Sequence, residues 1–344
     1  MRQEHESVNK ILKVPDMPLK GWASNNLVFD SEKQWSEPVN VNVLGLRWAR
    51  DVDQLCVKES KRISKLEEAW VPTKCRVLSM LVSIYDPLGL ISKLFVRGKL
   101  FLQQIWEDNV GWNDVLRREN VREASELLCE LKPVSNITLQ RTVGKKNLEL
   151  HVFTDASSKS YGAAAFTRDN CNQVSLFTSK MKITPKGMNK LTIPKLQLLA
   201  SLLGFRLAKT LKELIEPREI VMRTDSKVTL AWVASPNAKD NNNAFISNRV
   251  AEIIFFYQVC GFNLNHVLSK QNPADVLSRG ATTQQLLQNP LWRNGSEFLR
   301  NMGEPVPYKE DDPSNERTVV AAVQEMREEI RPVPPGEIWE ILQR

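Results

Sequence analysis

The chain has 344 residues with 47 Lys or Arg against 40 Asp or Glu, a formal net charge of +7. Its 42% hydrophobic and 25% charged content is typical of a globular protein with room for about two or three domains. No apolar run is long enough to span a membrane, and the polar N-terminus lacks a secretory signal. We therefore expect an intracellular protein, cytoplasmic or nuclear, with no membrane partner. Five cysteines without CxxC spacing argue against a disulfide framework or a zinc site.

The N-terminal part predicts a strand-rich segment followed by helices. VNVLGLRW (41–48) predicts a strand, because β-branched and aromatic residues dominate it. Thr73 can cap a helix that ends near Tyr85, since Pro87 disfavours helical angles at the residue before it. Apolar residues at helical spacing predict two more helices, over 92–109 and 121–132.

An α/β segment follows. Short connections between its first three strands predict antiparallel hairpins, and Pro194 is tolerated in the first turn of its long leucine-rich helix. The elements expected in chain order are three strands (148–155, 161–169, 173–180), a helix (192–214), a strand (219–225), two helices (225–233, 244–258) and a strand (262–269). Beyond about residue 282 the chain becomes polar and proline-rich, which predicts a linker with a helix near 292–301 and a loose helix around 318–330.

Three aspartates occupy comparable settings in this segment. Asp155 and Asp225 each end an apolar strand, and Asp275 lies where a turn leads into a helix. Two Mg²⁺ ions held by carboxylates can stabilise charge and activate water for phosphodiester hydrolysis. The two strand-end carboxylates would be neighbours if their strands pair. Any one of the three alone is better interpreted as a cap or turn residue, so only the set indicates metal chemistry.

The amino-acid sequence around these aspartates resembles that of a known family. FTDASSKSYGAAAF, TDSKVTLAWV and NHVLSKQNPADVLSRG are similar to the aspartate segments in the ribonuclease H region of BEL/Pao-type retrotransposon polyproteins. FISNRVAEI is similar to the helix between them. VLGLRW and TKCRVLSMLVSIYDPLGLISKLFVRGKLFLQQIW resemble the segments after the polymerase palm, which form the thumb and connection.

The resemblance implies an α/β fold, with a ribonuclease H-like mixed five-stranded sheet and flanking helices, preceded by a mainly helical thumb/connection-like region. The implied divisions are a palm-end remnant (1–60), the helical region (61–146), the ribonuclease H-like domain (147–282) and a tail or linker (283–344). The implied partners are an RNA:DNA hybrid or other nucleic acid and the rest of a retroelement polyprotein.

The resemblance also implies a two-ion site for Mg²⁺ or Mn²⁺ with Asp155, Asp225 and Asp275 as ligands. A fourth carboxylate is expected in a segment of the form I-P-(basic)-L-E-L. This chain reads IPKLQLLA, so Gln197 stands at that position. An amide can coordinate through its carbonyl oxygen, but it brings no charge and bridges two cations poorly. We therefore expect the hydrolysis of RNA in RNA:DNA hybrids to be impaired.

Further residues have two interpretations each. His266, shortly before Asp275, could help product release or proton relay, or could simply pack at a strand end. Lys180, Lys182 and Lys186 could follow a phosphate backbone or belong to a solvated loop. Arg249 could also reach nucleic acid.

The sequence lacks the motifs of two other activities, a polymerase and an aspartic peptidase. There is no Tyr-x-Asp-Asp polymerase signature and no Asp-Thr/Ser-Gly turn of an aspartic peptidase. Three functions stay open: a weakened ribonuclease H-type endonuclease, a non-catalytic nucleic-acid-binding or assembly module of a degenerate polyprotein, and a copy without a selected function.

Overall fold

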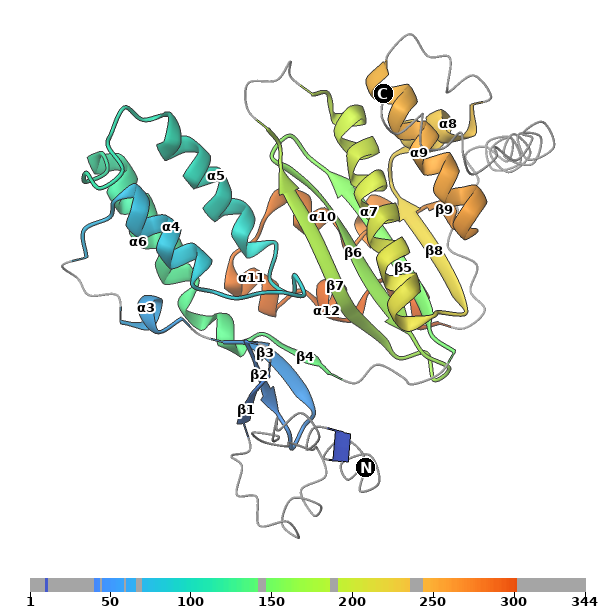
Figure 1. Cartoon of the computed structure of the whole chain (residues 1–344), viewed down its shortest axis with the longest axis horizontal. Helices are drawn as coiled ribbons and strands as arrows, with labels where there is room; N and C mark the ends of the chain where they lie inside the picture. The colour runs from blue at the N-terminus through green and yellow to red at the C-terminus, as the bar shows by residue number, and fades with distance from the viewer. Residues whose placement is uncertain are drawn as a thin grey trace.

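The computed structural model describes residues 10–11, 40–43, 45–58, 60–65, 70–141, 147–185, 191–235 and 244–301. Figure 1 shows three parts: a small antiparallel sheet, a group of helices, and a five-stranded sheet flanked by further helices. The helix expected over 318–330 lies outside the described residues.

The five-stranded sheet has the order β7-β6-β5-β8-β9. Strands β5 (Glu149–Ala156), β6 (Ser160–Arg168) and β7 (Val174–Ile183) form antiparallel hairpins, as the short connections predict. β8 (Glu219–Thr224) runs parallel to β5, and β9 (Asn263–His266) runs parallel to β8. The predicted mixed five-stranded sheet is therefore confirmed.

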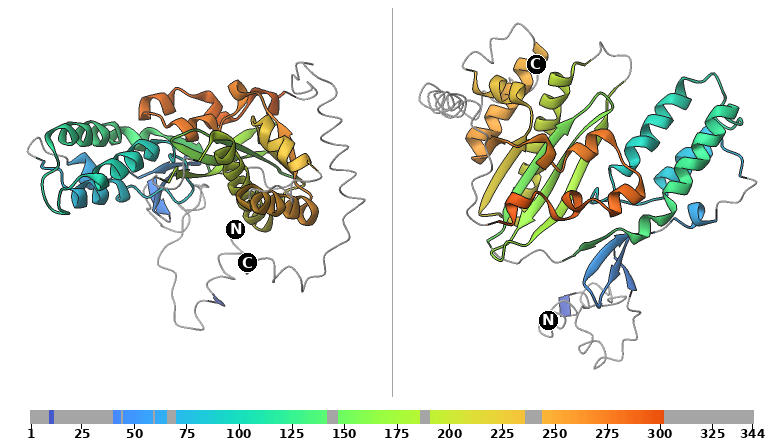
Figure 2. Two further views of the ribbon diagram at one scale, coloured as in Figure 1. Left: turned by 90° about the horizontal axis from the view of Figure 1, so that it is seen from above. Right: turned by 180° about the vertical axis from the view of Figure 1, so that it is seen from behind.

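Helices cover both faces of this sheet (Figure 2). On one face lie α7 (Ile193–Ile215), α8 (Lys227–Ala234) and α9 (Ala244–Cys260), whose apolar side chains share a core with Leu150 and Val152 of β5. Gly204 lets α7 approach the sheet closely, because a Cβ there would lie 2.5 Å from Thr154 Cγ2. Every residue of β5 is buried, as expected for a central strand covered on both faces.

The other face carries the C-terminal helices, and the helical region lies beside the sheet at its β7 edge (Figures 1 and 2). The C-terminal elements are η2 (Ser269–Gln271), α10 (Asp275–Arg279), α11 (Thr283–Leu287), α12 (Pro290–Asn294) and η3 (Glu297–Leu299). The helical region comprises α3 (Lys61–Ser64), α4 (Lys74–Val82), α5 (Leu94–Glu107), α6 (Arg118–Glu130) and η1 (Lys132–Asn136). Both contribute to one apolar core with Phe153 and Phe166 of the sheet. The helical region and the sheet thus share a core rather than forming separate ones.

The loop between α4 and α5 connects the helical region to the five-stranded sheet. The carboxylate of Asp86 accepts hydrogen bonds from the backbone N–H groups of Leu90 (2.8 Å) and Ile91 (3.0 Å). The Leu88 carbonyl then accepts from the Ser179 N–H of β7 at 2.9 Å. The helix ends before Pro87 as predicted, although α4 ends at Val82 and not near Tyr85.

The small sheet has the order β1-β2-β3-β4, with strands Asn40–Val43, Leu46–Ala49, Gln54–Val57 and Thr138–Gln140. The single strand predicted over 41–48 is wrong. Gly45 has φ +84° and turns the chain into a β1-β2 hairpin, with the ring of Tyr85 lying where a Cβ would project.

The expected boundary at 282/283 does not mark the end of the packed chain. Trp292 is 2% exposed, and its indole Nε1 donates to the Leu90 carbonyl at 3.0 Å. The single helix predicted over 292–301 is wrong, because Gly295 (φ +66°) separates α12 from η3. The described tail therefore packs against the sheet and the helical region up to about residue 301.

Candidate active site

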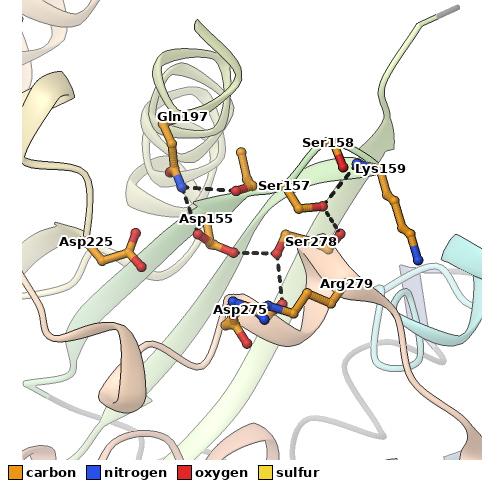
Figure 3. A pocket seen from close by; sticks show the side chains of 10 residues that line it. Asp155, Ser157, Ser158, Lys159, Gln197, Asp225, Asp275, Ser278 and Arg279 are labelled. Atoms are coloured by element: carbon orange, nitrogen blue, oxygen red, sulfur yellow. Dashed lines mark hydrogen bonds and ion pairs between the residues drawn. The ribbon is translucent and has the colours of Figure 1, made fainter. Parts of the chain in front are cut away.

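A cavity of about 390 Å³ opens where β5 and β8 end, facing the first turns of α7 and α10 (Figure 3). It contains the three aspartates and the glutamine that the sequence singles out. Its lining residues are Asp155, Ala156, Ser157, Ser158, Lys159, Gln197, Asp225, Asp275, Ser278 and Arg279. Parallel pairing of β5 with β8 brings the ends of these strands together, which is the condition the sequence argument required.

Asp155 is the central carboxylate and is 4% exposed. Gln197 Nε2 donates to its Oδ1 at 2.9 Å, and the Ser278 hydroxyl donates to its Oδ2. Burial raises the pKa of Asp155 and the negative charge of Asp225 raises it further, while the hydrogen bonds from Ser278 and Gln197 lower it. Both oxygens of this carboxylate are thus engaged by donors of the protein itself.

Gln197 reaches the cavity from the start of α7. Thr192 occupies the N-cap position and Pro194 lies in the first turn, so the helix begins just before the glutamine. Its Nε2 also donates to the Ala156 carbonyl at 3.1 Å, which fixes the amide orientation. Its Oε1 is buried without a hydrogen-bond partner in the described structure. The side chain therefore acts as a donor toward Asp155, where a carboxylate would be an acceptor.

The other two aspartates each have a protein partner. Arg279 Nε donates to Asp275 Oδ1 at 2.7 Å. Burial raises the pKa of Asp275, as does the charge of Asp155, and Arg279 opposes both effects. Ser269 Oγ donates to Asp225 Oδ2 at 2.7 Å, whereas Asp225 Oδ1 is buried without a partner in the described structure.

Ser278 is a site residue that sequence reasoning missed. It is fully buried, and its carbonyl accepts hydrogen bonds from the hydroxyls of Ser157 and Ser160, the latter at 2.9 Å. Its own hydroxyl also lies 2.9 Å from the Asp275 carbonyl. This network fixes α10 against the β5-β6 turn. A serine two residues before the glycine that ends a short helix gives no signal in sequence, and neither do Lys159 or Arg279 at the cavity rim.

The remaining predicted residues lie apart from the cavity lining. His266 ends β9 beside Thr224 and is half-buried. Lys180 and Lys182 are exposed on β7, and Lys186 lies outside the described residues. Arg249 is half-buried on α9, where its Nη1 donates to the Phe245 carbonyl at 2.8 Å.

The arrangement does not fit a two-ion site as it stands. Within the described ranges, no group of three or more His, Cys, Asp or Glu side chains is close enough to hold a metal ion. Asp155 accepts from two protein donors, and Asp275 accepts from the cationic Arg279. A metal ion here would have to compete with those donors for the carboxylate oxygens.

The strand order and the cavity at the ends of β5 and β8 define a ribonuclease H-like domain. Residues 73–226 match the family model described as the Pao retrotransposon-like RNaseH-like domain. Over these residues the chain is similar to the ribonuclease H-like domain of a retroelement polyprotein, in agreement with the resemblance of its first two aspartate segments. The match begins at the N-cap of α4 and includes Asp155, Gln197 and Asp225.

Solved structures with a similar fold are distant. The foamy viral protease-reverse transcriptase in complex with RNA/DNA hybrid is 13% identical (TM-score 0.49), with 77% of this chain and 37% of the viral chain covered. The same enzyme with dsDNA is 15% identical (TM-score 0.45; 67% and 45% covered). RNase H1 from Halobacterium salinarum is 13% identical (TM-score 0.27; 38% and 94% covered).

The chain thus spans less than half the length of these viral enzymes. The search of curated proteins gives no match. Among the described helices, none combines the length and apolar character of a membrane span.

Proposed function

We propose that this domain binds RNA:DNA hybrids at the cavity and that Gln197 impairs its two-metal hydrolysis of the RNA strand. The observation that carries the proposal is the convergence of Asp155, Asp225, Asp275 and Gln197 on one cavity. These residues come from four separate elements, so a purely local role as caps or turn formers does not account for the set.

The hydrogen bonds of Asp155 give the impairment a physical basis. Mg²⁺ or Mn²⁺ would be held by the three aspartates only after it displaced their protein donors, and it would then supply charge stabilisation for the phosphodiester. Gln197 removes one negative charge and directs its N–H group at Asp155 Oδ1, while Ser278 occupies Oδ2. Cation binding then has to break protein hydrogen bonds that a glutamate at the same position would not make. We therefore expect weak metal affinity and slow cleavage.

Nucleic-acid contacts are proposed for the basic residues outside the cavity. Lys180 and Lys182 are exposed on β7, and with Lys186 and Arg249 they offer a sequence-independent attraction for phosphate groups. His266 is proposed to assist proton relay or product release from the end of β9, next to the strand that leads into Asp225.

The second candidate is a non-catalytic nucleic-acid-binding or assembly module. The observation that favours it is again Asp155, whose two oxygens are both satisfied without a metal ion. A domain of this kind would retain the cavity and the basic residues but would not cut.

Cleavage and binding of a labelled RNA:DNA hybrid in Mg²⁺ and Mn²⁺ separate these candidates. The unmodified protein should bind and cut slowly, and Gln197→Glu should cut faster by at least about tenfold, since preorganised catalytic groups are worth several kcal/mol. Gln197→Glu combined with Asp225→Asn is the inactive control. Efficient cleavage by the unmodified protein refutes the impairment. Binding without cleavage by either form supports the non-catalytic module.

A further inference from the structure

Two tryptophans at the end of α5 are exposed and in contact with each other. Trp106, in the last turn of α5, is 54% exposed, and Trp112, in the loop that follows, is 43% exposed. Their rings meet edge to face with centroids 5.4 Å apart. Val115 of the same loop is exposed, and so is Val71, two residues before the Thr73 that pairs with Val115. We call Val71, Trp106, Trp112 and Val115 the tryptophan patch. Exposed apolar side chains gathered in this way mark interaction sites, whereas scattered ones do not.

The loop that carries Trp112 is fixed by hydrogen bonds to the start of α4. The Trp112 carbonyl accepts from the Cys75 N–H at 3.2 Å, and the Pro72 carbonyl accepts from the Leu116 N–H at 3.0 Å. The two indole rings are therefore presented in a preformed arrangement. A surface that is ordered before binding loses less conformational entropy when a partner arrives.

The chemistry of the patch fits a proline-rich segment. Within the described residues, neither indole N–H of Trp106 and Trp112 donates a hydrogen bond. A polyproline II segment presents flat apolar rings, and its backbone carbonyls have no internal hydrogen bonds. Aromatic surfaces recognise such segments because the segment is already ordered. The two tryptophans offer both the apolar surface and the N–H donors that this recognition needs.

The chain contains a segment of this kind. Residues 331–336, outside the described residues, read RPVPPG, with Glu329 and Glu337 close to the prolines. Residues 302–344 carry 10 Asp or Glu against 5 Lys or Arg, which leaves 42 Lys or Arg against 30 Asp or Glu in residues 1–301. The two parts therefore have net charges of opposite sign. Arg76 places a cation beside the patch, since its Nη1 donates to the Val71 carbonyl at 3.1 Å.

The length of the chain allows this segment to reach the patch in the same molecule. Twenty-nine residues lie between Asn301 and Arg331, and they can span at most about 100 Å. A folded body of about 300 residues has a radius of gyration of about 19 Å. A tethered segment has an effective concentration of about 1 mM, so a contact with a Kd of about 0.1 mM would already be mostly formed.

We propose that residues 331–336 dock on the tryptophan patch of the same molecule. The proline rings pack on Trp106 and Trp112, and the indole N–H groups donate to backbone carbonyls of the segment. The acidic residues beside the prolines lie toward Arg76. This inference goes beyond the proposed function and does not depend on it, because it involves neither the cavity nor a nucleic acid.

The test is the binding of a labelled peptide with the sequence of residues 328–340 to the full-length chain, measured by fluorescence anisotropy. A triple variant with Pro332→Ala, Pro334→Ala and Pro335→Ala removes the internal competitor, so it should bind the peptide at least about tenfold more tightly than the unmodified chain. Adding Trp112→Ala to this variant should weaken peptide binding at least about tenfold, since tryptophans dominate contacts of this kind. Adding Leu214→Ala instead removes an exposed apolar side chain of α7 and should leave binding unchanged.

Two controls keep the test specific. Pro305→Ala with Pro307→Ala removes two other prolines of the same part of the chain, and this variant should bind the peptide as weakly as the unmodified chain. Thermal unfolding shows whether each variant is folded, and Trp106→Ala replaces Trp112→Ala if the latter does not fold.

Four results would overturn the proposal. The first is equal peptide affinity of the unmodified chain and the triple variant. The second is unchanged affinity in both Trp106→Ala and Trp112→Ala. The third is a molar mass in light scattering that rises with concentration and falls in the triple variant, because the occupant is then a second copy. The fourth is weaker hybrid binding by Trp112→Ala with unchanged peptide binding, because the patch then serves nucleic acid. None of these measurements uses cleavage, so the proposed function stands or falls separately.

Discussion

Gln197→Glu should make the stability of this protein depend on a divalent metal. In the structure the Gln197 amide donates to Asp155 Oδ1 and to the Ala156 carbonyl, at 2.9 and 3.1 Å. A glutamate has no N–H group, so both hydrogen bonds are lost and a second carboxylate faces a buried one. Loss of a hydrogen bond to a charged acceptor costs about 1.5–3 kcal/mol, and leaving buried acceptors unpaired adds about 1–3 kcal/mol.

The expected loss of about 3–5 kcal/mol without metal corresponds to a fall in Tm of about 6–20 °C for a body of this size. Mn²⁺ should restore much of it, because an ion at about 100 times its Kd stabilises by about 2.7 kcal/mol. Differential scanning calorimetry in EDTA and in Mn²⁺ measures both quantities. Gln197→Met is the matched control: it loses the hydrogen bonds without adding charge, so it should lose stability in EDTA and should respond to Mn²⁺ less than Gln197→Glu.

Two results would refute this reasoning. If Gln197→Glu melts at the same temperature as the unmodified protein in EDTA, the amide does not hold Asp155 in the way the hydrogen bonds indicate. If Mn²⁺ stabilises the unmodified protein as much as the variant, the donors on Asp155 do not compete with metal ions.

Three further predictions concern the supporting residues. Lys93 is fully buried, and burial lowers its pKa to about 7. The unfolded chain therefore binds more protons between about pH 7 and 10.5, so stability should rise with pH across that window by about 5 kcal/mol, and Lys93→Met should abolish the rise in urea unfolding. An equal rise in the variant would contradict this. Ser278→Ala removes a hydrogen bond that lowers the pKa of Asp155, so an NMR titration of that carboxyl should show a higher pKa; a lower one would be inconsistent with the geometry. Trp292→Ala should cost about 3–5 kcal/mol in urea unfolding, and a loss under about 1 kcal/mol would mean that the tail does not belong to the core.

The elements that carry the site could be predicted from sequence because their signals are local. Alternation in 148–155 and the Thr192–Pro194 start of the long helix depend on neighbouring residues only, and both β5 and α7 form as expected. The meeting of the strand ends at Asp155 and Asp225 depended on one condition, that the two strands pair, and the structure fulfils it by the parallel pairing of β5 with β8.

The features that were missed depend on residues distant in sequence. Trp292 looks like part of a polar tail until its partner, the Leu90 carbonyl more than 200 residues earlier, is known. Ser278 has no pattern that separates it from a surface serine. The position of Gln197 could be predicted, but the direction of its amide could not, because that is set by the Ala156 carbonyl on another element.

The bond between the Leu88 carbonyl and the Ser179 N–H has a consequence for how the chain can be divided. β7 is an outer strand of its sheet, and the loop between α4 and α5 occupies backbone groups that would otherwise be open to another strand. A fragment beginning at residue 147 would lose that cover together with the apolar side chains that pack on Phe153. It would present an unprotected edge of the kind that recruits a second copy or seeds aggregation. The helical region therefore prevents this sheet edge from pairing with a second copy. The smallest fragment that does not self-associate should begin before α4.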